Sequence, residues 1–124
     1  MTANAIRSYK DLIVWQKAIV LVEDCFATTA NFPKGELYGL TSQMRRASVS
    51  IPSNIAEGFG RDQTGYFIQF LRVSMGSARE LETQVIIAER VKFIEPDAAS
   101  RLGTKCEEIS KMLRALVRSL EENK

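Results

Sequence analysis

The sequence predicts an all-α protein, an antiparallel up-down-up-down four-helix bundle, on three observations. Apolar residues recur every three or four positions along four long stretches of the chain. Short segments containing proline, glycine or polar turn residues separate these stretches. No stretch shows the alternation expected of a β-strand. Long helices joined by short turns pack as antiparallel neighbours, so we expect a single domain over all 124 residues.

The first expected helix spans about residues 9–31. Its apolar face, read at helical spacing, consists of Leu12, Trp15, Ile19, Val22 and Phe26. Other apolar residues lie off that face, which predicts a second covering surface. Phe32 to Gly35 interrupts the pattern, because proline disfavours a helical residue before it.

The second expected helix spans about residues 36–58. Its apolar stripe is Leu40, Met44, Ala47, Ile51 and Ile55. Pro52 lacks a backbone N–H donor and should kink this helix. We expect Gly58 and Gly60 to end it, because glycine adopts the left-handed cap conformation at little cost.

The third and fourth helices are expected at about residues 64–91 and 96–122. The core stripe of the third is Phe67, Phe70, Leu71, Ser74, Ala78, Leu81, Val85 and Ala88. Gly76 lies in the middle of this helix, where it should allow a neighbouring helix to approach closely. The seam of the fourth helix alternates steps of four and three along Leu102, Cys106, Ile109, Leu113, Leu116 and Leu120.

Composition fits a protein with a hydrophobic core and an ordinary surface. Hydrophobic residues make up 45% of the chain and charged residues 26%. No run approaches the roughly 18 apolar residues of a membrane span, and no signal peptide is visible, so we expect a cytoplasmic protein. Cys25 and Cys106 lie on apolar stripes and are expected to be reduced thiols in the core. A net charge of +2 does not by itself indicate a nucleic-acid binder.

The residues that most enzymes use are scarce. The chain has no histidine, its two cysteines have no metal-ligand spacing, and it has no glycine-rich phosphate loop. We therefore expect no catalytic residues, no metal and no cofactor. Glu57, Glu80 and Glu82 are possible acids and bases. The favoured interpretation is that Glu80 or Glu82 pairs with an arginine of the second helix instead.

A polar stripe runs beside the apolar stripe of the second helix. It consists of Arg46, Ser50, Ser53 and Glu57, which keep one helical face. Short polar side chains suit close packing, so we expect a hydrogen-bonded seam against another helix, with Arg45 or Arg46 pairing with Glu80 or Glu82. The simpler alternative is a core helix that contains a proline and has no further role.

The arginines of residues 61–91 share one side of the third helix. At about 100° per residue from Arg72, Arg79 falls near −20° and Arg90 near zero, and Arg61 extrapolates to near −20°. Close by on the same wheel lie Ile68, Met75 and Ile86. One interpretation is a solvated outer face with scattered apolar residues. The other is an arginine row that binds nucleic-acid phosphates, flanked by an apolar oligomer interface.

Four segments of the chain resemble one protein family. The longest lies within Ser42 to Arg61 and reads SQ.RRA..SI..NIAEG.GR. The others are LIVWQ from Leu12, FP..ELYGL from Phe32 and GSARELET from Gly76. They resemble the four-helix-bundle proteins encoded in intervening sequences of 23S rRNA genes, and their relatives, the accessory proteins of diversity-generating retroelements. The resemblance implies a ring-shaped homopentamer that binds nucleic acid, with a reverse transcriptase as a further partner.

Together these observations predict a non-enzymatic, oligomeric bundle that binds RNA, or DNA, through contacts between arginines and phosphates. The alternative is a structural or protein-interaction module in which the same arginines meet carboxylates of neighbouring subunits. A ring would multiply a modest basic stripe into a strong field.

Overall fold

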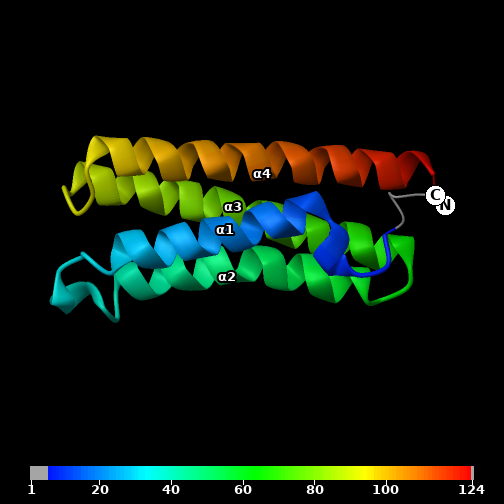
Figure 1. The fold of residues 1–124 in the computed structure, drawn as a ribbon, viewed down its shortest axis with the longest axis horizontal. Coiled ribbons are helices and arrows are strands. Elements are labelled where there is room, and N and C mark those ends of the chain that lie inside the picture. The colour runs from blue at the N-terminus through cyan, green and yellow to red at the C-terminus, as the bar shows by residue number, and fades with distance from the viewer. Residues whose placement is uncertain (1–5, 124) are drawn as a thin grey trace.

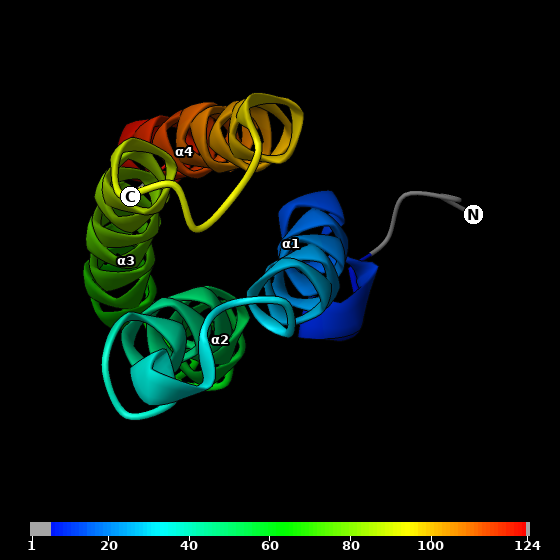
Figure 2. The ribbon, with the colours of Figure 1, turned by 90° about the vertical axis from the view of Figure 1, so that its left-hand side faces the viewer.

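The structure, a computed structural model, describes residues 6–123. It contains the four helices α1 (Ile13–Thr29), α2 (Leu40–Phe59), α3 (Thr64–Arg90) and α4 (Pro96–Glu122). Short 3₁₀ turns precede the first two helices: η1 (Tyr9–Asp11) and η2 (Lys34–Glu36). Each helix runs antiparallel to the one before it and packs against it, and α1 closes the bundle against α4 (Figures 1 and 2). The predicted all-α up-down bundle is confirmed.

The apolar stripes predicted for α2, α3 and α4 form the core. Met44, Ile51 and Ile55 of α2 are fully buried. They meet Leu71 and Leu81 of α3, and the buried stripe of α4 completes the centre with Leu102, Cys106, Ile109 and Leu113. The core positions of these three helices could be predicted from the sequence because each helix buries a single stripe at helical spacing.

The predicted core face of α1 is wrong. The buried stripe is Val14, Ala18, Leu21 and Cys25, whereas Phe26 is 39% exposed. The small side chains of Ala18 and Cys25 leave room for the other helices at the bundle centre. The larger Trp15, Ile19 and Val22 lie to one side, where they and α2 line an open groove. The helix is apolar on two adjacent sides, and periodicity alone could not rank them.

The helix ends also differ from the sequence prediction. Helix α2 runs unbroken through Pro52 and ends at Phe59, and Gly60 caps it with a right-handed φ of −76°. The left-handed residue of this connection is Asp62, with a φ of 61°. Position 58 requires glycine for a different reason, which is that it has no room for a side chain. A Cβ there would lie 2.5 Å from the Cβ of Phe70. At the other end of α2, residues 34–36 form η2, so the helix begins later than expected.

Gly76 does not have the packing role expected of it. It is exposed in the middle of α3, and a Cβ added there would have no atom within 4 Å. The two cysteines agree with prediction, since both are buried and free. No helix within residues 6–123 is long and apolar enough to cross a membrane.

Candidate nucleic-acid interface

The predicted arginine row lies on the outer face of α3. This helix continues unbroken for 27 residues and buries Leu71, Ala78 and Leu81, so the opposite side faces solvent. All four predicted arginines are exposed: Arg61, Arg72, Arg79 and Arg90. The position expected from helical geometry agrees with the structure for Arg72, Arg79 and Arg90. Arg61 lies in the turn before α3 and stacks over Phe70, about 160° round the helix from Arg72, so it is not part of the row.

Three of these arginines already contact a carboxylate. The closest pair joins Arg72 to Glu121 of α4 at 2.7 Å. Arg61 contacts Glu57 at 2.9 Å and stacks over the Phe70 ring at 5.2 Å. Arg79 lies 3.5 Å from Glu82. No carboxylate of the described chain lies within ion-pair distance of Arg90.

These ion pairs leave the guanidinium groups available to an anion. The side chains of Arg72 and Arg79 are 59% and 57% exposed. Exposed pairs of this kind contribute about 0–1 kcal/mol, because water and salt screen them. A guanidinium also has five N–H donors, more than one carboxylate accepts. A phosphate can therefore replace or join the carboxylate at little cost.

The apolar residues predicted to flank the row lie mostly inside the protomer. Ile68 is 4% exposed and belongs to the core, so its placement on an exposed interface is wrong. Met75 is half-buried and packs on the core. The reason is that both lie between Arg72 and the buried Leu71 on the helical wheel, at the border of the core face. Ile86 alone of the three is exposed, at 49%.

The polar stripe of α2 divides between two environments. The Ser50 hydroxyl shares a 2.8 Å hydrogen bond with the Ser77 hydroxyl of α3, and the amide of Asn54 donates to Ser50. Ser74 of α3 donates to the Ile51 carbonyl at 2.9 Å. A hydrogen-bonded seam between α2 and α3 is thus present, with Ser50 as its member from the predicted stripe. The other three residues, Arg46, Ser53 and Glu57, are exposed.

The expected pairing of Arg45 or Arg46 with Glu80 or Glu82 is not formed. Arg45 points to α1, where its Nε donates to the Thr29 hydroxyl at 2.9 Å and its guanidinium lies 4.7 Å from the centre of the Phe26 ring. Position 45 lies on the side of α2 next to α1, whereas Glu80 and Glu82 belong to α3. Glu82 binds Arg79 instead, and the Gln84 amide donates to Glu80 at 3.4 Å.

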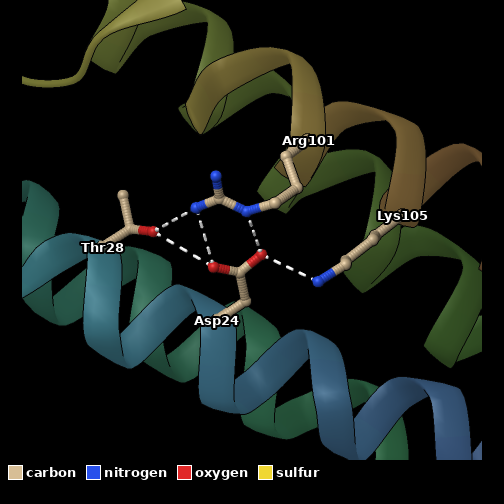
Figure 3. A network of polar contacts seen from close by, with 4 residues as sticks. All are labelled: Asp24, Thr28, Arg101 and Lys105. Atoms are coloured by element: carbon tan, nitrogen blue, oxygen red, sulfur yellow. Dashed lines mark hydrogen bonds and ion pairs between the residues drawn. The ribbon is translucent and has the colours of Figure 1, made fainter. Parts of the chain in front are cut away.

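A polar cluster that the sequence did not predict joins α1 to α4 (Figure 3). The Asp24 carboxylate accepts two hydrogen bonds from Arg101, at 2.8 and 3.0 Å, and one from Lys105 at 2.9 Å. The bonds from Arg101 hold the pKa of Asp24 below its ordinary value, outweighing the effect of burial. The same contact raises the pKa of Arg101. The four-residue spacing of Arg101 and Lys105 places both on one side of α4, but which helix they face could not be read from it.

The described part of the chain contains no group of three or more histidine, cysteine, aspartate or glutamate residues arranged to hold a metal ion. Burial raises the pKa of the Cys106 thiol to about 12, and it also raises the pKa of Cys25. Neither thiol is therefore activated as a nucleophile. What the surface of α3 offers is a row of exposed guanidinium groups, which suits anion binding.

The model of the 23S rRNA-intervening sequence protein family matches residues 10–115. The chain belongs to this family. Among solved structures, this intervening-sequence protein is similar to a protein of unknown function from the S23 ribosomal protein family of Bacteroides thetaiotaomicron, with a TM-score of 0.77 and 20% sequence identity. The match covers 85% of this chain and 98% of that one, and at this identity it shows a shared fold. No curated protein matches the chain.

Proposed function

We propose that this intervening-sequence protein is a non-enzymatic, cytoplasmic RNA-binding protein whose α3 arginine row contacts phosphates. The observation that carries the proposal is the set of exposed guanidinium groups on one face of a single unbroken helix, centred on Arg72 and Arg79. Arginine suits this role because its planar guanidinium stays charged and can bond two phosphate oxygens at once. Phosphate contacts carry no sequence information, so binding is only weakly selective for sequence.

The protein acts as a ring-shaped homo-oligomer, with five subunits by family resemblance. Assembly repeats the arginine row around the ring and produces a strong field from protomers of net charge +2. Exposed apolar side chains on the outer faces of α1 and α3, such as Val20 and Ile86, support association. Light scattering at micromolar concentration tests this assembly. A mass of 13.9 kDa, that of the monomer, would contradict both the ring and the amplified field.

The test of RNA binding is a salt titration with two unrelated single-stranded RNAs. The affinity of the parent should fall steeply with salt, with a log–log slope of about −0.7 per phosphate contact. Arg79→Ala should weaken binding to both RNAs alike and make the slope shallower. The matched control is Lys34→Ala, which removes one positive charge at the turn between α1 and α2. Unchanged affinity and slope for Arg79→Ala would show that the arginine row does not bind RNA.

A second candidate function is a protein-interaction module, with a reverse transcriptase as one partner, as in retroelement accessory proteins. The observation in its favour is the set of exposed apolar side chains on α3, Val73 and Ile87 among them, at 50% and 45% exposure. Failure of the parent to bind any RNA or DNA at low salt would favour this candidate over the first.

A further inference from the structure

The ion pair between Arg72 and Glu121 fixes the register of α3 against α4. The two helices are antiparallel neighbours, so moving forward along α3 corresponds to moving back along α4. Seven residues on from Arg72 is Arg79, and seven residues back from Glu121 is Arg114. Each step covers about 10 Å at about 1.5 Å per residue. Arg79 and Arg114 therefore lie at the same level of the bundle, with Arg118 between that level and the ion pair.

Helical geometry also gives the side of α4 on which these arginines lie. At about 100° per residue, Arg114 falls about 20° and Arg118 about 60° from Glu121. Glu121 itself reaches across to α3. The buried Leu113 lies about 80° away on the other side. Arg114 and Arg118 are both exposed, and within residues 6–123 no carboxylate lies within ion-pair distance of either.

We propose that the RNA-binding surface crosses from α3 onto α4, so that Arg72, Arg79, Arg114 and Arg118 form one two-helix basic patch. This inference rests on the proposed function and specifies its surface. Arg114 and Arg118 have no paired carboxylate that a phosphate would have to displace, so they bind phosphate without first losing an ion pair. The four arginines outnumber the two carboxylates paired with them, Glu121 and Glu82, so the patch keeps a net positive charge across two adjacent helices.

Acidic side chains set the end of the patch. Beyond Arg79, the groove between α3 and α4 is lined by Glu82, Glu89 and Glu107, together with small residues such as Gly103. Carboxylates repel phosphates, so an RNA strand turns away from this half of the face. Arg90 lies in this acidic half, at about the level of Gly103 by the same register. It therefore contributes less to binding than its place in the α3 row suggests.

The test compares single substitutions on a single-stranded oligouridine probe, measured by fluorescence anisotropy over a series of salt concentrations. Arg114→Ala and Arg118→Ala should each lower affinity roughly two- to fivefold at low salt, which is the scale of one exposed charge contact. Each should also make the log–log slope shallower by about 0.7. Lys34→Ala, the charge control at the turn between α1 and α2, should change affinity by less than about twofold. Glu107→Gln should raise affinity, because it removes a repelling charge from the end of the patch.

Two results would overturn this inference in distinguishable ways. If Arg79→Ala weakens binding while Arg114→Ala and Arg118→Ala bind like the parent, the surface is confined to α3 and the proposed function stands. If the parent does not bind the probe at low salt, the proposed function fails and the patch fails with it. Circular dichroism and light scattering establish that each variant folds and assembles like the parent, so that a loss of affinity reports the contact itself.

Discussion

Gly58 of α2 lies directly against Phe70 of α3. A Cβ at position 58 would be 2.5 Å from the Phe70 Cβ and 3.2 Å from the Phe67 ring. Real Cβ atoms do not approach so closely, so any larger residue would push the helices apart. The contact lies near the end of α2, beyond the serine hydrogen bonds that join α2 and α3 at mid-length. Close packing there holds α3 and its arginine row in place.

The first prediction is that Gly58→Ala destabilises the protein. Overpacking should lower the free energy of unfolding by about 1–3 kcal/mol. Gly76→Ala is the matched control, because an alanine there enters open space on an exposed helix. It should raise the same free energy by about 0.5–1 kcal/mol, since alanine favours a helix more than glycine does. Urea denaturation measures both, and equal stability of the two variants would mean that α2 and α3 are farther apart than described.

The helices that were predicted accurately have one buried stripe bounded by clear breaks. Helix α4 begins at Pro96 as expected, and its seam from Leu102 to Leu113 is buried. The core face of α1 was predicted wrongly because its two apolar stripes adjoin. Leu21 faces the core because of where α2 and α4 lie, which the sequence of α1 does not show. Periodicity describes one helix, whereas burial depends on its neighbours.

The same limit explains which features of the candidate site could be predicted from the sequence. The shared face of Arg72 and Arg79 was predictable, because it follows from the geometry of one helix. Partners on other helices were not, so the contact of Arg72 with Glu121 was missed. The burial of Ile68 in the core was missed for the same reason. Contacts between helices depend on register, which a single sequence does not give.

The second prediction concerns the pH dependence of stability at Asp24. Its pKa in the folded protein lies below the ordinary value of 3.8. The ionised carboxylate therefore stabilises the fold above that value, and this stabilisation is lost as the pH falls through the folded-state pKa. Asp24→Asn should lower the free energy of unfolding by about 1–3 kcal/mol at pH 7, as loss of charged hydrogen bonds does. The difference should shrink below about pH 4. A difference that stays constant down to pH 2 would contradict a role for the charge.

The third prediction is that both cysteines are protected in the folded protein. Burial raises the pKa of Cys106 to about 12, so only about one thiol in ten thousand is ionised at pH 8. Cys25 is also buried, and its Sγ lies 3.6 Å from the Met44 carbonyl oxygen. Iodoacetamide should therefore modify neither residue rapidly without denaturant and both in urea. Rapid modification of one cysteine in the native protein would show that the core opens locally.

The fourth prediction separates two adjacent arginines. Arg45→Ala should lower the free energy of unfolding by about 1–2 kcal/mol, because it removes a hydrogen bond to Thr29 and the contact with the Phe26 ring. Arg46 is exposed, so Arg46→Ala should stay within about 0.5 kcal/mol of the parent. Thermal unfolding compares the two variants. A large loss of stability for Arg46→Ala would place Arg46 in a contact between subunits.

The fifth prediction locates the surface through which the protein assembles. Ile86 of α3 and Val20 of α1 have nearly equal exposure, 49% and 48%, and lie on different helices. If α3 forms the interface, Ile86→Ser should dissociate the oligomer, because a hydroxyl replaces apolar area that association buries. Val20→Ser should then leave the oligomer intact. Neither change should alter the free energy of unfolding of the protomer by more than about 0.5 kcal/mol, since both side chains are exposed.

Light scattering over a dilution series gives the mass of each variant. Dissociation by Val20→Ser alone would move the interface to α1, and normal assembly of both variants would exclude Ile86 and Val20 from it.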